Sequence, residues 1–242
     1  MEYTARFVKT GNMKIGHTMW SWNKLAGSGV IAGCQGTCGK HCQGCYNMDD
    51  PKKSPCYVFK SYNRYGWDDS SVVKGHIRNT QIMRDNIEKA FSDIKLQLSR
   101  TRKKPSAVRI HSSGELETVQ EFREWIDTAT IAPEVPFYIY SKNYEVLDEV
   151  LSTMDTKKIP KNFFINISIW HEEGIDIYNK WKHLDCIRAF VYDDGYDYSK
   201  VLKFDCYCPA YDKNGKLKHD LTCDKCKICF QKKAKICGCY SH

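Results

Sequence analysis

Eleven of the 13 cysteines in this 242-residue chain are concentrated in two short segments. The first segment holds Cys34, Cys38, Cys42 and Cys45 within twelve residues. The second segment is the last 37 residues, and it holds the other seven: Cys206, Cys208, Cys223, Cys226, Cys229, Cys237 and Cys239. The start, MEYTARFVKTGNMKIG, lacks the apolar core of a signal peptide, so we expect a cytosolic protein whose thiols stay reduced. Grouped, reduced thiols are typical of metal binding.

The first group has the spacing C-x3-C-x2-C at Cys38, Cys42 and Cys45, in the stretch CGKHCQGCYN. Three thiolates on one short loop can hold three irons of a [4Fe–4S] cluster and leave the fourth iron without a protein ligand. Structural zinc sites usually take four ligands in two pairs from separate segments. Cys34 could supply a fourth ligand, but four cysteines on one loop are unusual for zinc. The spacing therefore favours an iron–sulfur cluster.

A second metal site is predicted at four cysteines of the tail: Cys208, Cys223, Cys226 and Cys229. C-x2-C-x2-C with one remote cysteine is a frequent iron–sulfur pattern. Zinc is the alternative, because the Cys223 and Cys226 pair with Cys237-x-Cys239 would make a four-cysteine knuckle. We expect a cluster, an arrangement that leaves Cys206, Cys237 and Cys239 unassigned.

Alternating strands and helices are predicted to position these loops. Strands are expected at four short apolar runs: 107–111, 136–140, 163–169 and 187–192. Four helices are expected from apolar residues that recur with a period of 3.6. One precedes the first strand, at residues 87–98, and the other three lie between the strands and begin at about residues 118, 143 and 175. Thr118, which has capping-box spacing with Glu121, and Asn143 are expected to be helix N-caps.

The segment before these elements is less regular. Residues 24–33, KLAGSGVIAG, contain a short apolar run that we expect to be a first strand leading into the cysteine loop. Residues 46–80 are polar and aromatic, and NRYGWDDS within them is expected to be a loop.

The repeated alternation predicts an α/β fold with a parallel sheet that is curved or barrel-like. We expect a β/α domain over residues 1–200 and a cysteine-rich metal-binding extension over 201–242. Chemistry in such sheets collects at the carboxyl ends of the strands. Small polar residues follow two of these ends, SSGE at 112–115 and SKN at 141–143.

CGKHCQGCYN after a first strand resembles the radical S-adenosylmethionine superfamily, and especially small activating enzymes such as that of anaerobic ribonucleotide reductase. These enzymes also have glycine at the position of Gly44, where most superfamily members have an aromatic residue. The resemblance implies a partial (β/α) barrel and a [4Fe–4S] cluster on Cys38, Cys42 and Cys45 whose open iron binds S-adenosylmethionine. Reductive cleavage would give methionine and a 5′-deoxyadenosyl radical that abstracts hydrogen from a substrate. An electron donor such as flavodoxin or ferredoxin is implied.

The superfamily also carries a Gly-Gly-Glu-like motif that binds the amino group of S-adenosylmethionine, and Ser113, Gly114 and Glu115 are similar to it. The resemblance further implies contacts with the cofactor from Gly44 and from polar residues at later strands: Ser141, Lys142, Asn166 and Ser168. The tail is similar to the auxiliary clusters that several radical enzymes carry after the barrel. VVKGHIRN and RIHSSGE are also similar to an uncharacterised phage-associated family, over most of the chain, which implies no activity.

A non-enzymatic zinc protein that binds nucleic acid is the alternative class. The net charge is +8, and the chain from Cys206 onward has eight lysines against three aspartates. This tail and the aromatic stretch YVFKSYNRYGW at 57–67 would contact nucleic acid. That class explains the charge but not the β/α alternation or Ser113 to Glu115. Within the enzyme class, a protein, a nucleotide or a nucleic acid is the candidate substrate, and no membrane association is expected.

Overall fold

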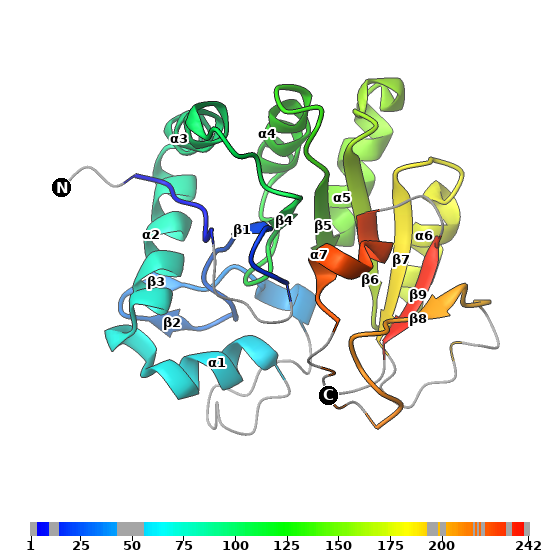
Figure 1. The fold of residues 1–242 in the computed structure, drawn as a ribbon, viewed down its shortest axis with the longest axis horizontal. Coiled ribbons are helices and arrows are strands. Elements are labelled where there is room, and N and C mark those ends of the chain that lie inside the picture. Colours follow the sequence, from blue (N-terminus) through cyan, green and yellow to red (C-terminus); the bar gives the residue numbers. More distant parts are fainter. Residues whose placement is uncertain are drawn as a thin grey trace.

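The computed structural model describes residues 4–9, 15–42, 56–192, 198, 202–214, 216, 218, 221–230 and 234–239, and for Cys42, Asp68 and Tyr192 it describes the backbone alone. Seven of the described strands form one sheet (Figure 1): in spatial order β1 (Trp20–Trp22), β4 (Val108–Ile110), β5 (Phe137–Ser141), β6 (Phe163–Ile169), β7 (Ile187–Tyr192), β9 (Ile236–Cys239) and β8 (Cys206–Tyr207). Each strand is parallel to its neighbours. The predicted α/β class with a parallel sheet is confirmed.

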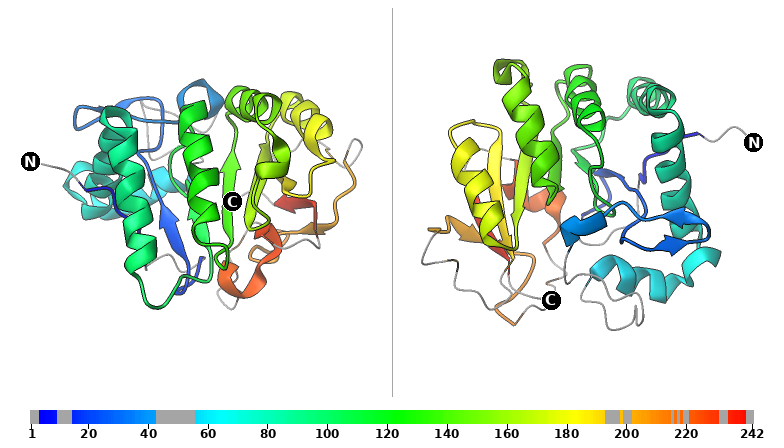
Figure 2. Two further views of the ribbon diagram at one scale, coloured as in Figure 1. Left: turned by 90° about the horizontal axis from the view of Figure 1, so that it is seen from above. Right: turned by 180° about the vertical axis from the view of Figure 1, so that it is seen from behind.

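Seven α-helices occur in the described part of the chain: α1 (Tyr57–Tyr65), α2 (Ser71–Asp85), α3 (Ile87–Arg100), α4 (Val119–Thr130), α5 (Tyr144–Thr153), α6 (Glu172–Trp181) and α7 (Cys223–Cys226). Helices α3 to α6 lie side by side along one face of the sheet, and α7 lies against the other (Figures 1 and 2). Within the same residues, no helix has both the length and the apolar character needed to cross a membrane.

Both faces of the sheet are buried, as a parallel sheet requires. In β5, Phe137 and Ile139 pack into the core shared with α3 to α6, whereas Tyr138 belongs to a separate cluster with Phe164 and Phe230. Phe230 comes from the tail, in the short 3-10 helix η6 (Ile228–Phe230). We call the face under the tail the inner face. It is formed by alternate residues of the strands: Arg109, Tyr138, Tyr140, Phe164, Asn166 and Arg188.

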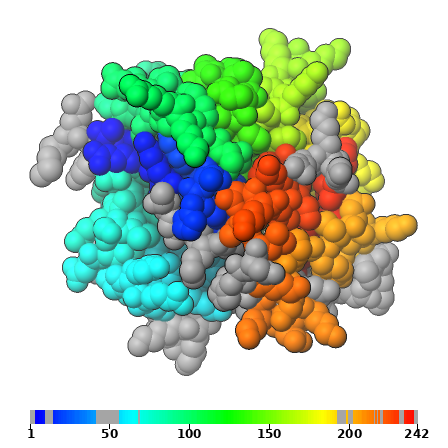
Figure 3. Space-filling model, in the orientation of Figure 1, coloured from blue at the N-terminus to red at the C-terminus, as the bar shows by residue number. Residues whose placement is uncertain are grey.

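The tail joins the same sheet. β9 pairs with β7 so that Cys237 lies opposite Phe190, and β8 is the edge strand. The predicted boundary near residue 200 falls between β7 and β8, and the chain beyond it completes the sheet and then covers the inner face. Asp224 of the tail accepts a hydrogen bond of 2.9 Å from the Thr18 hydroxyl. In the space-filling view the tail therefore lies beside the segment that leads into β1 (Figure 3).

The predicted strands at 107–111, 136–140, 163–169 and 187–192 are confirmed as β4, β5, β6 and β7. The four predicted helices are confirmed as α3, α4, α5 and α6. Thr118 caps α4 by accepting from the Glu121 amide at 3.1 Å, and Asn143 caps α5 by accepting from the Val146 amide at 3.2 Å. Glu121 does not return the capping-box hydrogen bond, because its carboxylate is taken by a buried ion pair.

One expectation for the N-terminal part is wrong, and two helices in it were not predicted. The first sheet strand is Trp20–Trp22, not a run within 24–33, where Val30–Ile31 (β2) forms only a two-residue hairpin with Cys34–Gln35 (β3). Trp20, Ser21 and Trp22 are all buried, so they show no alternating pattern. Residues 57–85 form α1 and α2, with NRYGWDDS spanning the turn between them. The buried side of α2 includes His76, Asn79 and Thr80, which hide its apolar periodicity.

A buried ion pair fixes the ends of β1 and β4 relative to α4. Lys24, which is fully buried, donates to Glu121 at 2.7 Å and to Glu117 at 3.0 Å. His111, directly after β4, contacts the other oxygen of Glu121 at 2.9 Å. Burial acts to raise the pKa of Glu121, but the neighbouring Lys24 charge and the His111 contact outweigh it and lower this pKa to about 2. The turn that follows His111 is held by these contacts.

Glu121→Ala is expected to lower the free energy of unfolding by about 3 kcal/mol, because it leaves the Lys24 charge buried with Glu117 as its remaining partner. Urea unfolding measures this loss. The matched control is Glu124→Ala on the same helix, which breaks a partly exposed ion pair with Lys95 and should cost less than about 1 kcal/mol. Equal losses in the two variants would contradict a structural role for the buried pair.

The same carboxylate should make stability depend on pH. Its folded pKa of about 2 lies below the ordinary 4.5, so its contribution is present above pH 4.5 and is lost as the pH falls towards 2. Between about pH 6 and pH 3 the wild type should therefore lose more stability than Glu121→Gln. Parallel losses in the two proteins would count against this prediction.

Candidate functional site

The first cysteine loop begins in a fixed position. The Cys38 amide donates to the Gly27 carbonyl at 2.9 Å, and the Cys38 sulfur accepts from the Gly27 amide at 3.2 Å. A short 3-10 helix, η1 (Gly39–Cys42), follows it. The structure thus places the half-buried Cys38 and the backbone of Cys42, whereas Gly44 and Cys45 lie outside the described residues.

Cys34 is more deeply buried than Cys38, which packs against the same apolar cluster from its edge. It is buried in an apolar cluster with Leu25, Val58 and Tyr62, and burial raises the pKa of its thiol. A thiol in such surroundings stays protonated and packs as a small apolar side chain. This placement fits a core residue rather than a fourth ligand of the loop.

The turn after β4 touches the cysteine loop. The Glu115 amide donates to the hydroxyl of Thr37, the residue before Cys38, at 2.9 Å. Gly114 has a φ of +82°, and a Cβ at this position would lie 2.7 Å from the Thr37 hydroxyl oxygen. Only glycine allows this conformation at this closeness. The two segments that were predicted to share a site are therefore in direct contact.

The carboxylate of Glu115 is buried and oriented by three donors. One oxygen, Oε1, accepts from the Ser141 hydroxyl at 2.7 Å and from the Leu116 amide at 2.9 Å, and Oε2 accepts from the Lys142 amide at 2.9 Å. A carboxylate has about four acceptor positions, so among the described residues Oε2 keeps one position for a further donor. Ser141 and Lys142 thus meet Glu115 at the carboxyl edge of the sheet, as their positions in the sequence predicted.

The two polar residues of β6 are placed differently. Asn166 lies on the inner face, where its amide nitrogen donates to the carbonyls of Ile139 and Cys229, both at 3.2 Å. It therefore holds the tail against the sheet. Ser168 is buried near the carboxyl end of β6, and its carbonyl accepts from the Tyr144 hydroxyl at 2.5 Å.

The second cysteine group surrounds one small cavity between the tail and the inner face. Five cysteines line it: Cys208, Cys223, Cys226, Cys229 and Cys237. The first four are those predicted from spacing, and the turn of α7 followed by η6 brings three of them together. Cys237 comes from β9, whose pairing with β7 places it there; the sequence grouped it with Cys223 and Cys226 only in the zinc alternative.

The lining of this cavity suits a metal held by thiolates. No carboxylate or histidine is found among its described lining residues. Burial, together with the neighbouring thiols, raises the pKa of Cys229 to about 12 and also raises the pKa of Cys226 and Cys237. A bound cation would stabilise the thiolates and reverse this effect. Sulfur-only ligation is typical of zinc and of iron–sulfur clusters.

The thiols share the cavity without forming a complete metal-binding group. In the part of the chain that the structure describes, no three His, Cys, Asp or Glu side chains are arranged to hold a metal ion. Ligation here therefore requires the cysteine side chains to turn towards a common centre. The cavity has a volume of about 20 Å³, which is room for about one water molecule.

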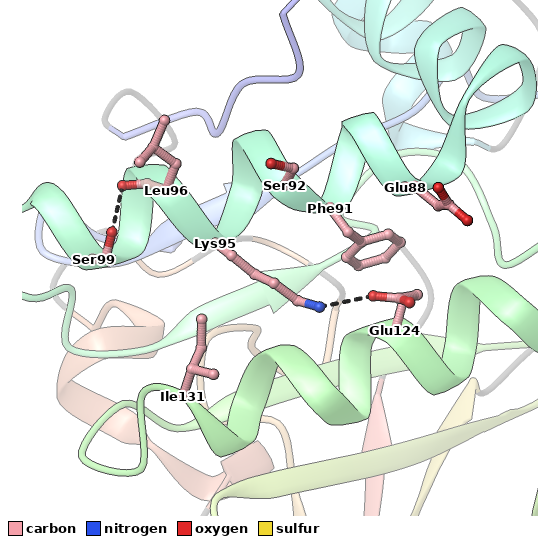
Figure 4. Close-up of a pocket in the computed structure, with 8 residues that line it drawn as sticks. All are labelled: Glu88, Phe91, Ser92, Lys95, Leu96, Ser99, Glu124 and Ile131. Atoms are coloured by element: carbon pink, nitrogen blue, oxygen red, sulfur yellow. Dashed lines mark hydrogen bonds and ion pairs between the residues drawn. The ribbon is translucent and has the colours of Figure 1, made fainter.

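A larger hollow on the outer surface lacks comparable chemistry (Figure 4). It lies between α3 and α4 and has a volume of about 530 Å³. Its described lining includes the Lys95–Glu124 ion pair at 2.9 Å and the apolar Leu96 and Ile131, but no cysteine or histidine. The candidate site is therefore the carboxyl edge with the inner face, not this hollow.

Comparison with known proteins identifies a family. No curated protein and no solved structure matches the chain. The sequence model of a family described as GP88, Gene product 88, matches residues 4–232, which is nearly the whole chain. The chain therefore belongs to the Gene product 88 family.

Proposed function

We propose that the chain is a radical S-adenosylmethionine enzyme that reductively cleaves S-adenosylmethionine at a [4Fe–4S] cluster held by Cys38, Cys42 and Cys45, and that the 5′-deoxyadenosyl radical abstracts hydrogen from a substrate. The observation that carries the proposal is the contact of Glu115 with Thr37. It joins the start of the cysteine loop to the Ser113–Glu115 turn.

The sheet supports the same proposal. β1, β4, β5, β6 and β7 are neighbours in chain order and parallel throughout, with α3 to α6 packed on one face. When all crossover connections turn the same way, the connecting helices lie on one face of the sheet. The opposite face then carries no crossover helix, as in a partial (β/α) barrel. The carboxyl ends of β1 and β4 then supply the two segments that are in contact.

The residues at this edge have distinct roles in the proposal. Glu115 would bind the ammonium group of S-adenosylmethionine through the acceptor position left on Oε2, since a carboxylate pairs strongly with an ammonium group. Ser141 and the Lys142 amide would hold the carboxylate in place. Gly114 would let the backbone lie against Thr37. A reductant such as flavodoxin or ferredoxin would supply the electron.

Cys208, Cys223, Cys226 and Cys229 would hold a second iron–sulfur cluster. Five cysteines line their cavity, and its described lining has no carboxylate or histidine, which supports metal binding by sulfur. Its small volume favours a single zinc ion, because four irons and four sulfides need more room than one ion. Zinc at the tail is therefore the second candidate, and with it a protein that binds nucleic acid through the tail.

The first test concerns iron at the loop. Protein reconstituted without oxygen should lose about four irons when Cys38, Cys42 and Cys45 are all changed to Ala. Iron and sulfide analysis on the same sample measures the loss. Cys34→Ala is the matched control and should keep its iron, because Cys34 packs in an apolar cluster. A triple variant that retains all of its iron would place the cluster elsewhere.

The second test concerns Glu115. Glu115→Gln keeps the size of the side chain but removes its charge, and it should weaken S-adenosylmethionine binding by about 1.5–3 kcal/mol in calorimetry. The wild type with a strong reductant should form 5′-deoxyadenosine. Glu149→Gln, at an exposed position of α5, is the control and should bind normally. Unchanged binding in Glu115→Gln would remove this residue from the site.

The third test separates the two metals of the tail. Cys208→Ser should abolish a cluster held by Cys208, Cys223, Cys226 and Cys229, and Cys239→Ser should leave it intact. A zinc knuckle of the Cys223–Cys226 pair with Cys237 and Cys239 predicts the opposite pattern of loss. Elemental analysis of both variants for iron and zinc decides between them. The zinc protein should also bind oligonucleotides with an affinity that falls steeply with salt.

A further inference from the structure

Arg109 is a half-buried residue of the inner face, on β4, the second strand of the sheet, and it has no charge partner among the described residues. It is the middle residue of β4, and its neighbours Val108 and Ile110 point into the opposite core. Its Nε is buried and has no hydrogen-bond partner among the described residues. Its guanidinium lies 5.0 Å from the centre of the Tyr140 ring. Within the same part of the chain, no carboxylate forms an ion pair with it.

A second unpartnered group lies next to it. Tyr138 is 1% exposed, and its hydroxyl is buried without a hydrogen-bond partner in the described structure. Tyr138 and Arg109 interact electrostatically with each other. Buried polar groups are nearly always hydrogen-bonded, and each one left unpaired costs stability. Two of them side by side therefore indicate a ligand that contacts both.

The chemistry of the two side chains specifies the ligand. A guanidinium has only donors, and a phenol hydroxyl can donate as well. The ligand must therefore bring acceptor oxygens, and the positive charge of Arg109 calls for a negative one. Arginine recognises carboxylate and phosphate groups through two parallel hydrogen bonds.

The position of Arg109 connects it to both candidate metal sites. The guanidinium also interacts with Tyr57 and Cys223. The Tyr57 hydroxyl donates to the carbonyl of Ser112, next to the Ser113–Glu115 turn, and Cys223 lines the cavity of the second group. Arg109 therefore lies between the turn and the tail, on the face that the proposed barrel encloses.

We propose that Arg109 and Tyr138 form a binding site for a carboxylate or phosphate group on the inner face. The identification of that group as part of the substrate rests on the proposed function, whereas anion binding itself does not. The site would hold an anionic substrate with its remainder directed towards the carboxyl edge.

Calorimetry with the full-length protein tests the site, using inorganic phosphate and acetate as separate probes at matched ionic strength. The wild type should bind at least one probe, and the stronger probe identifies the group. Arg109→Gln should weaken that binding by at least about tenfold, which corresponds to 1.36 kcal/mol. Tyr138→Phe should weaken it several-fold. Arg102→Gln, at an exposed position, is the control and should bind as the wild type does.

Thermal unfolding gives a readout that does not need activity. The bound anion should raise the midpoint of the wild type and leave that of Arg109→Met unchanged, because a ligand stabilises only the state that binds it. Without anion, Arg109→Met should be at least as stable as the wild type, since it removes a half-buried charge that has no ion-pair partner among the described residues. A less stable Arg109→Met that also loses the metal of the tail would show that Arg109 balances the thiolate charge, and it would overturn the proposal.

The two proposals fail separately. Formation of 5′-deoxyadenosine by a wild type that binds neither probe would overturn the anion site alone. Anion binding that depends on Arg109, in a protein that makes no 5′-deoxyadenosine under any reductant, would overturn the radical chemistry and support the site.

Discussion

A parallel sheet must be covered on both faces, and this chain covers them with unequal material. Four helices rich in apolar residues cover one face, and the tail covers the other with few apolar side chains, of which Phe230 packs on Tyr138 and Phe164. Five cysteines line the small cavity between the tail and this face. A segment so poor in apolar residues gains little from burial, so metal binding would contribute folding free energy directly. The cover of the inner face and the proposed second metal site are then the same structural element.

The carboxyl edge depends on charges buried beneath it. Lys24 follows β1 and Glu121 begins α4, so their ion pair fixes where both segments leave the sheet. The turn from Ser113 to Glu115 lies above this pair, and its own contacts with Thr37 and Ser141 are ordinary hydrogen bonds. The three described donors around Glu115 hold its carboxylate at one position and leave one acceptor site open in the part of the chain that the structure describes. The proposed contact with a ligand would need such support.

The sequence predicted most of the sheet, because β5, β6 and β7 are largely apolar runs between turn residues. It did not predict α2, whose buried side carries His76 and Asn79, nor β1, which is too short and too uniformly buried to alternate. Cysteine spacing is local and was visible for both groups. The roles of Thr37 and Arg109 were not visible, and Cys237 was grouped with Cys223 and Cys226 only in the zinc alternative, because each depends on a contact between segments far apart in the chain. Such contacts follow from strand order and register, which no local pattern contains.

The tail has lysines on its exposed side and thiols on the side that faces the sheet. The positive charge of the tail therefore indicates little about what the thiols bind. Five of its lysines are exposed: Lys213, Lys216, Lys218, Lys225 and Lys227. The thiols face the sheet, where the nearby cations are Arg109 and Arg188, the second of them 2% exposed. Lys227 also lines the metal cavity, whereas the other four of these lysines are not among its lining residues and would attract nucleic acid or an acidic partner protein. Inward arginines, in contrast, lower the cost of gathering negative thiolates or an anionic ligand on the inner face. The positive charge of the tail is thus compatible with an iron–sulfur cluster and with zinc. The candidate functions differ in what they place on the inner face.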